Sequence, residues 1–431
     1  MDKKIGFPST IALVIGSQVG SGIFLLPTIL APFGWYSVFG WIISGTCAII
    51  LATVFARLCF WLPRTGGPHV FATEAFGPII GFFTGWTYWV ISWVSTTAVI
   101  IAASDYIGLL TGQFFNNQNL VIQLLLLLCV ALLNVRGVRA AGSLEFVLTV
   151  LKFIPLILLP AFCLIYFDSN NIKTEPEILS SSISNTLNNL VMLTLWGFIG
   201  LESGTTPAES IENPSITIPV AIIMGTAIVV FLYLFNNIGI LGAMPSYKFL
   251  HSKAPYADVA RYLFGGQWHI LISIIASILC FGTLNAWTLS SSQIALGLSR
   301  DNFLPSVLGK TNRNGAPYIA ILVSSIGTMP LLYLATCSNM PFQIEEIIDF
   351  SVIAFLFIYL ISCLALLKLN FDKSHRLTSA WVYGVAGTLF CIWILFQTGT
   401  KTLLFAFIFV LTGAPVYFLK NKKNRRLNIE S

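Results

Sequence analysis

Two apolar segments long enough to cross a membrane are each interrupted near their centre by glycines. The first runs from about residue 10 to 31 and contains Gly16, Gly20 and Gly22, and the second runs from about residue 187 to 208 and contains Gly197, Gly200 and Gly204. Lipid cannot satisfy the backbone N–H and C=O groups that such breaks release, so they persist where the backbone lines a cavity. Paired breaks in the two halves of a chain indicate the substrate site of a transporter. The pattern therefore predicts a protein that moves a small molecule across a membrane.

The composition supports a membrane protein without a soluble domain. Of 431 residues, 56% are hydrophobic and 9% are charged, and the mean hydropathy is +0.84, whereas a soluble domain carries about 25% charged residues. A spanning helix needs about 20 mostly apolar residues. We predict twelve spans, centred near residues 20, 48, 94, 127, 156, 198, 230, 282, 325, 357, 388 and 410. The predicted fold class is an all-α polytopic membrane protein in a single transmembrane domain, residues 1–431.

The basic residues predict the orientation of the chain in the membrane. If the N-terminus is cytoplasmic, 18 of the 23 Lys and Arg residues fall on the inside, which is the bias expected when both termini are cytoplasmic. The inside set comprises Lys3, Lys4, Arg57, Arg64, Arg136, Arg139, Lys152, Arg300, Lys310, Arg313, Lys368, Lys373, Arg376 and the five basic residues after position 419. The net charge of +6 thus reflects topology and does not indicate a nucleic-acid partner.

The residues that could support catalysis or bind a metal are scattered. The eight cysteines form no CxxC pair, and the four histidines lie in loops or near span ends. Neither a disulfide framework nor a zinc site follows from these spacings, and no cluster of acid, base and nucleophile is evident. We therefore expect neither an enzyme nor a metal or cofactor.

The two breaks offer opposite polarities to a ligand. A helix that starts in mid-membrane presents unpaired N–H groups, which attract an anion, whereas the C=O end of a helix attracts a cation. The N–H groups around Ser21, Gly22 and Ile23 could hold a carboxylate, and the carbonyls of residues 196–199 could hold an ammonium group. Together they would hold the backbone of an amino acid. The alternative is that the glycines form a small-residue surface for helix packing.

Several motifs resemble the amino acid–polyamine–organocation superfamily, and especially its basic amino acid/polyamine antiporters. They are Gly20-Ser21-Gly22-Ile23-Phe24-Leu25-Leu26-Pro27, the loop from Pro63 to Pro68, the run from Trp196 to Ser203, Glu212-Asn213-Pro214, and the run from Gly282 to Leu289. The likeness is strongest to arginine/agmatine antiporters. It implies a secondary transporter in a bacterial inner membrane that exchanges a cationic amino acid for its decarboxylated amine or for a related amino acid. No cofactor is expected, and a homodimer is one expected assembly.

The resemblance also implies a LeuT-like fold with broken helices 1 and 6. Residues of about 8–167 and 187–370 would form two inverted repeats, and two further helices would follow at about 379–420. By the same likeness Ser21, Gly22 and Ile199 surround the carboxylate and amino end of the substrate, Trp196 and Trp287 face its cationic side chain, and Ser351 lies near its far end. Tyr88, Glu202 and Tyr359 match gating positions that close the cytoplasmic side.

Two positions depart from the antiporter pattern. Ser17 and Thr96 stand where that family has asparagines, and the asparagine matched by Thr96 helps to bind the substrate head group. A hydroxyl still accepts a hydrogen bond from ammonium or guanidinium. The substitution at Thr96 nevertheless weakens the case for strict arginine selectivity.

Tryptophans and one acid give support that does not depend on the resemblance. An indole face attracts a desolvated cation by about 2 kcal/mol or more, and Trp196 stands in the second break, although tryptophans also anchor membrane interfaces. An acid within a span by default marks a transport path or proton relay, which makes Glu202 a candidate proton sensor, its alternative role being a structural hydrogen bond. Glu145 and Lys152, seven residues apart, are interpreted as an interfacial or a structural pair.

Three classes of function remain open on the sequence. A substrate exchanger is favoured, a proton-coupled symporter or uniporter would share its architecture, and a channel or membrane scaffold would leave the two breaks unexplained. The expected partners are a cationic amino acid, an amine and the lipid bilayer.

Overall fold

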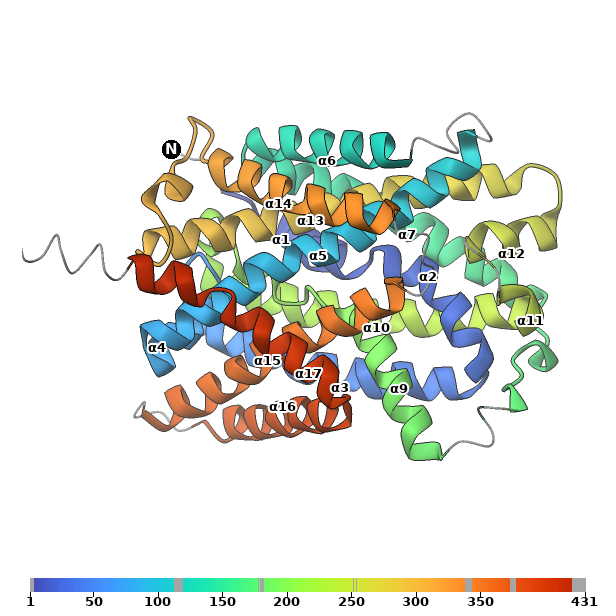
Figure 1. The fold of residues 1–431 in the computed structure, drawn as a ribbon. Coiled ribbons are helices and arrows are strands. Elements are labelled where there is room, and N and C mark those ends of the chain that lie inside the picture. Colours follow the sequence, from blue (N-terminus) through green and yellow to red (C-terminus); the bar gives the residue numbers. More distant parts are fainter. Residues whose placement is uncertain are drawn as a thin grey trace, which may run out of the picture.

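The computed structural model describes residues 4–111, 119–176, 178, 182–250, 252, 254–337, 343–372 and 377–420. This part of the chain is almost entirely helical (Figure 1), with one isolated parallel bridge between Ile5 and Ile211. The prediction of an all-α fold is confirmed.

Nine helices of the described chain are long and apolar enough to cross a membrane. They are α3 (Tyr36–Trp61), α5 (Pro78–Thr111), α7 (Val138–Ile165), α10 (Pro214–Ala243), α13 (Trp268–Arg300), α14 (Tyr318–Cys337), α15 (Gln343–Asp372), α16 (Thr378–Gln397) and α17 (Thr400–Leu411), whose span continues to Lys420. A shorter apolar helix, α6 (Asn119–Val135), accompanies them.

The two remaining predicted spans are the interrupted ones. The first consists of α1 (Phe7–Gln18) and α2 (Ser21–Leu30), and the second consists of α9 (Ile183–Leu195) followed by short 3-10 turns at Trp196–Phe198, Ser203–Thr205 and Ala208–Ser210. The helices at all twelve predicted positions are therefore present, with breaks in the first and sixth. How the two halves are related by symmetry stays a prediction.

Short elements connect the long helices at their ends. They are α4 (Pro68–Phe76), α11 (Ser246–Phe249), α12 (Pro255–Phe264) and 3-10 turns at Ala31–Phe33, Ser169–Asn171 and Ser306–Gly309.

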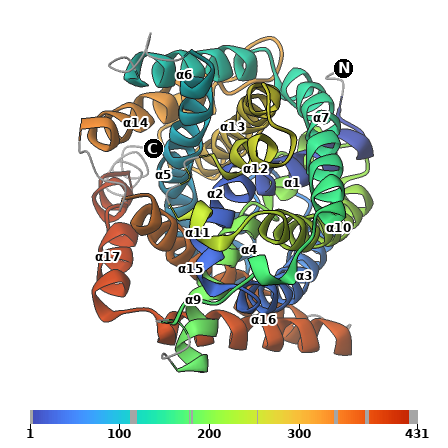
Figure 2. The same cartoon turned by 90° about the vertical axis from the view of Figure 1, so that its right-hand side faces the viewer.

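The interrupted helices lie in the middle of the bundle. Seen end-on, α1 and α2 are surrounded by α3, α5, α7, α10, α13 and α15, while α6, α14, α16 and α17 lie further out (Figure 2). The helix α1 packs against α7, α10 and α13. Apolar side chains on the outer helix α6, such as Leu125, Leu128 and Leu132, are more than half exposed, as expected for a surface that faces lipid. The backbone breaks are thus removed from lipid and face protein.

A proline in α7 shows how this bundle satisfies backbone groups within the membrane. Pro160 has no N–H, so the carbonyl of Leu156, four residues earlier, loses its helical donor. The amide of Asn236 on α10 replaces it, because Asn236 Nδ2 donates to Leu156 O at 2.8 Å. Tyr256 on α12 holds the other end of that amide by donating to Asn236 Oδ1 at 2.9 Å.

The basic residues assigned to one side do gather at one end of the bundle. Lys4, Arg136, Arg139, Arg300 and Arg313 line a shared cavity of about 790 Å³. Both ends of the described chain lie toward this side, on the left in Figure 1. The sequence-based assignment of Lys152 to the cytoplasmic side was wrong: Lys152 lies in α7, and its side chain is buried inside the bundle.

Candidate functional site

The carbonyl end of the first break is already occupied by donors from the protein. Lys152 Nζ donates to the carbonyls of Gly16 and Val19, at 3.0 Å each. The hydroxyl of Thr283 on α13 lies 3.0 and 2.9 Å from the same two oxygens. Two further donors complete the set: Trp287 Nε1 bonds Ser17 O at 3.1 Å and the Tyr233 hydroxyl bonds Gln18 O at 2.8 Å. A ligand therefore finds little free carbonyl here.

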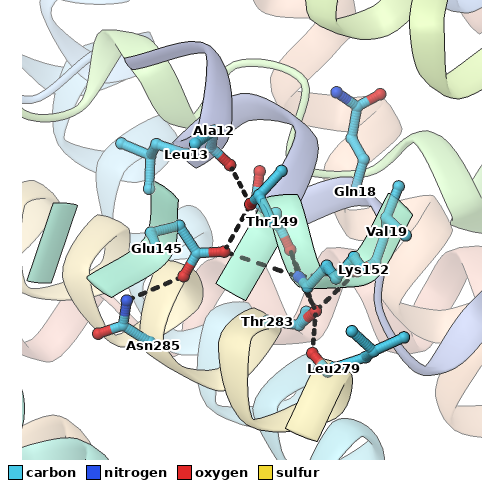
Figure 3. A network of polar contacts seen from close by, with 12 residues as sticks. Ala12, Leu13, Gln18, Val19, Glu145, Thr149, Lys152, Leu279, Thr283 and Asn285 are labelled. Atoms are coloured by element: carbon cyan, nitrogen blue, oxygen red, sulfur yellow. Dashed lines mark hydrogen bonds and ion pairs between the residues drawn. The ribbon is translucent and has the colours of Figure 1, made fainter. Parts of the chain in front are cut away.

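Lys152 belongs to a buried polar network that joins α1, α7 and α13 (Figure 3) and reaches α6 through Asn134. Its Nζ lies 3.6 Å from Glu145 Oε1, and both side chains are at most 1% exposed. Asn285 donates to Glu145 Oε2 at 2.8 Å and accepts from Asn134 on α6 at 3.1 Å. Gly16 is required beside this pair, because a Cβ at that position would overlap the Glu145 carboxylate. Of the two interpretations of Glu145 and Lys152, the structural pair is correct.

The second break turns sharply at Gly200 and is tied to the first. Gly200 has a φ of +103°, a conformation that favours glycine. Ser17 Oγ donates to Gly200 O at 2.8 Å and lies 2.7 Å from Ser203 Oγ. The serine that departs from the antiporter pattern thus connects the two interruptions.

A small cavity of about 20 Å³ lies between the two breaks. It is lined by Ser17, Gln18, Gly20, Gly22, Ser95, Val99, Trp196, Gly197, Ile199, Thr283 and Trp287. Its volume suits a water molecule rather than an amino acid, so the described conformation is closed around the site. A Cβ on Gly22 would lie 3.2 Å from the Trp196 ring, which shows that the α2 backbone packs directly on this indole.

Some predicted site residues line the cavity and others do not. Gly22, Trp196, Ile199 and Trp287 line it. Ser21 starts α2, but its side chain lies outside the described part of the structure. The remaining three, Ile23, Thr96 and Ser351, are buried but are not among the lining residues.

Sequence reasoning missed Ser95, Val99, Thr283 and Gln18 as lining residues. Ser95 and Val99, four residues apart, share the face of α5 that lines the cavity, whereas the sequence prediction named Thr96, which is not on that face. An uncharged amide such as Gln18 in an otherwise apolar break is itself a signal that could have been used.

Two of the three predicted gating residues, Glu202 and Tyr359, contact each other beside the second break. Tyr359 on α15 donates to Glu202 Oε2 at 2.7 Å, and the N–H of Gly200 donates to the Tyr359 hydroxyl at 3.4 Å. The Tyr88 ring lies 6.3 Å from that of Trp287 and 5.4 Å from that of Phe355. Glu202 takes part in none of the ion pairs found among the described residues.

A second set of ion pairs lies at the basic end of the bundle. Asp301 Oδ1 lies 3.2 Å from Arg64, and Asp301 Oδ2 lies 3.1 Å from Nε2 of the buried His69. Burial alone raises the pKa of Asp301, but the hydrogen bond from His69 and the charges of His69, Arg64 and Arg300 outweigh it, so the pKa lies below its usual range. Arg300 also pairs with the half-exposed Glu209 at 2.6 Å.

The described residues contain no group of three or more His, Cys, Asp or Glu side chains that could hold a metal ion.

Comparisons with known proteins agree with this architecture. The family model for amino acid permeases matches residues 5–421. The cadaverine/lysine antiporter of Escherichia coli (strain K12) is 27% identical over 435 residues, covering 98% of this chain and 96% of the relative. A putative arginine/ornithine antiporter of Bacillus subtilis is 27% identical over 465 residues (97% and 98% covered), and the putrescine transporter PotE of Haemophilus influenzae is 26% identical over 420 residues (96% of each).

Proposed function

Because the chain belongs to the amino acid permease family, and is thus an integral membrane transporter and not an enzyme, we propose that it is an antiporter that exchanges a cationic amino acid for an amine. The observation that carries this proposal is the lining of the cavity between the two breaks. The N-terminus of α2 and the side chains of Trp196 and Trp287 meet there. Relatives named as antiporters of such substrates support it.

The two polarities of the site suit the two ends of an amino acid. The helix α2 has no side-chain cap at its N-terminus, so the N–H groups of Ser21, Gly22 and Ile23 are available to a carboxylate. The indole faces of Trp196 and Trp287 attract a desolvated cation. No Asp or Glu lines the cavity in the described structure, which lets the substrate be released without breaking a buried ion pair.

The substrate pair is the finer part of the proposal. The sequence motifs favour arginine and agmatine, whereas the relatives are named for lysine and cadaverine, for arginine and ornithine, and for putrescine. All of these molecules carry a primary ammonium group. Arginine/agmatine and lysine/cadaverine exchange are therefore the two pairs to be tested side by side.

Glu202, Tyr88 and Tyr359 are proposed to close the cytoplasmic side and to respond to protons. The carboxylate of Glu202 accepts a hydrogen bond from Tyr359, which in turn contacts the backbone of the second break at Gly200. Protonation of Glu202 would remove a charge from this contact and loosen it. We further propose that both termini are cytoplasmic, because the basic residues gather at that end of the bundle.

Glu202 also supports a second candidate function, proton-coupled symport. A buried acid without a basic partner among the described residues is able to carry a proton through a transport cycle. In that mechanism uptake would depend on a proton gradient and not on a substrate inside.

Counterflow in proteoliposomes separates these functions. Vesicles loaded with cadaverine or agmatine are diluted into labelled lysine or arginine, and uptake is compared with empty vesicles and with empty vesicles under an imposed proton gradient. Antiport predicts uptake only into loaded vesicles, with no proton gradient needed. Equal uptake into empty vesicles under the gradient would overturn antiport in favour of symport.

A further inference from the structure

Gln18, the last residue of α1, carries a buried oxygen atom without a partner. The residue is 4% exposed and is among those that line the cavity between the breaks. Its Nε2 donates to Val14 O at 3.0 Å and lies 3.5 Å from the Thr226 hydroxyl. Since Val14 O can only accept, this contact fixes which end of the amide is the nitrogen. Within the described structure, Gln18 Oε1 is therefore an unpaired buried acceptor.

The surrounding acceptors of the first break are already used. The carbonyls of Gly16 and Val19 are occupied by Lys152, and those of Ser17 and Gln18 are occupied by Trp287 and Tyr233. A cation that enters the cavity needs new oxygen atoms to replace its water. Gln18 Oε1 supplies one from α1, and the Ser95 hydroxyl, which is also buried without a partner among the described residues, supplies another from α5.

An unpaired buried acceptor lowers stability unless some group comes to bind it. We propose that Gln18 is a substrate-binding residue whose Oε1 accepts a hydrogen bond from the primary ammonium group of the transported molecule. This inference rests on the proposed function, because it needs a cationic substrate in the cavity. It assigns to Gln18 a role that neither the motif resemblance nor the paired breaks assign.

The chemistry of the amide suits a carrier that must release its substrate. A single neutral oxygen accepts one of the three N–H groups of an ammonium ion, whereas the planar fork of a guanidinium is matched by two adjacent acceptors. A carboxylate in place of Gln18 would hold the cation by a buried charge pair, which is expensive to separate. The amide gives selectivity for ammonium without that barrier.

Gln18→Met tests the proposal, because methionine keeps the length of the side chain and removes the acceptor. Asn188→Leu is the matched control: Asn188 on α9 also has a buried, unpaired amide atom, but it lines a separate cavity of about 570 Å³. Purified wild type and both variants are titrated with cadaverine and with lysine by calorimetry. The melting temperature of each substrate-free protein is recorded as well.

We expect Gln18→Met to weaken binding of both molecules by about tenfold or more, as for the loss of a hydrogen bond to a charged group. Its substrate-free melting temperature should not fall, because Val14 O keeps the Ser17 hydroxyl as a donor at 3.0 Å. Asn188→Leu should bind like the wild type. Gln18→Glu keeps an acceptor oxygen on a side chain of the same length but loses the donor to Val14 O, and it should bind cadaverine more tightly than Gln18→Met does.

Two results would overturn the proposal while the proposed function survives. The first is wild-type affinity in Gln18→Met, as expected if a bound water and not the substrate satisfies Oε1. The second combines two observations: the melting temperature of substrate-free Gln18→Met falls, and Gln18→Glu binds cadaverine no better than Gln18→Met. Both are expected if Gln18 only packs. A wild-type protein that binds none of cadaverine, lysine, agmatine and arginine would instead refute the proposed function.

Discussion

The two helix breaks meet at one cavity, but each is stabilised in a different way. The first is held by a buried cation, Lys152, which is itself paired with Glu145 at 3.6 Å. The second lies beside a buried acid, Glu202, which is held by the hydroxyl of Tyr359 and forms no ion pair in the described structure. Glu145 is thus neutralised by Lys152, whereas Glu202 can gain or lose a proton without leaving a buried cation unpaired.

This difference suggests a division of roles. Removing one partner of a buried ion pair leaves an uncompensated charge, so the Glu145–Lys152 pair is suited to holding the first break rigid through a transport cycle. A carboxyl group that is bonded only to hydroxyl and backbone groups is suited to switching. The first break would be the fixed wall of the site and the second its moving part.

Lys152→Met is expected to have the largest effect on the fold. It strands the buried Glu145 carboxylate and removes a donor from Gly16 O and Val19 O, at a cost of about 3–5 kcal/mol. We expect a large drop in the melting temperature of the purified protein. The double variant Lys152→Met, Glu145→Leu should recover part of it, because both charges are then absent. A single variant as stable as the wild type would contradict the role of Lys152 as the brace of the first break.

Trp196→Leu should have its main effect on binding. The indole at the second break contacts Gly22 across the cavity, and the loss of a desolvated cation–π contact corresponds to about 2 kcal/mol, or more than tenfold in affinity. Calorimetric titration with cadaverine checks this, and the melting temperature serves as the control. Trp287→Phe should be milder than Trp287→Leu. A loss of expression in Trp196→Leu equal to its loss of affinity would favour a packing role.

Glu202→Gln should change the pH dependence of exchange more than its maximal rate. Glutamine keeps an oxygen that accepts from Tyr359 but does not titrate. If protonation of Glu202 loosens the cytoplasmic gate, wild-type exchange rises as the pH falls, and the variant shows a flatter profile. The initial exchange rate measured in proteoliposomes between pH 5 and 8 decides this. An unchanged profile would return Glu202 to a structural role and remove the contrast between the two buried acids.

Asp301→Asn should have the smallest effect on stability, because this acid, unlike Glu145 and Glu202, pairs with an exposed side chain. Its partner Arg64 is 54% exposed, and exposed ion pairs contribute roughly 0–1 kcal/mol. Because the folded-state pKa of Asp301 is depressed, the contribution is present above the usual aspartate value of 3.8 and is lost as the pH falls through the lower folded-state value. The melting temperatures of wild type and variant should therefore converge below pH 3.8. A constant difference down to pH 2 would show that the carboxylate charge is not the cause.

The sequence was sufficient to predict the twelve spans found in the described chain and the positions of both breaks. Hydropathy and length identify spans because lipid demands long apolar helices, and the glycine runs at Gly20–Gly22 and Gly197–Gly200 stood out against them. Trp196 and Glu202 could be identified as candidate site residues because each residue type is unusual at the centre of a span.

The partners of the first break could not be predicted from spacing. Lys152 was assigned to the cytoplasmic side from the distribution of basic residues along the chain, yet it reaches carbonyls 133 and 136 residues away in the chain. Contacts of this kind depend on how α7 and α13 pack around α1. Thr96 was named because it matches a substrate-binding position of the resembled antiporters. The residue that lines the cavity is Ser95, whose side chain points about 100° away from that of Thr96 around the helix.

The central claim is that both breaks form a single substrate site, and Gly22→Leu tests it most directly. A side chain at Gly22 would meet the Trp196 ring of the other break, whereas Gly108, near the end of α5, has open space around its Cβ position and provides Gly108→Leu as the matched control. The measurement is counterflow of labelled lysine into cadaverine-loaded proteoliposomes, for variants that elute as single folded species. We expect no exchange above background for Gly22→Leu and wild-type exchange for Gly108→Leu. Exchange by Gly22→Leu at the wild-type rate would contradict it.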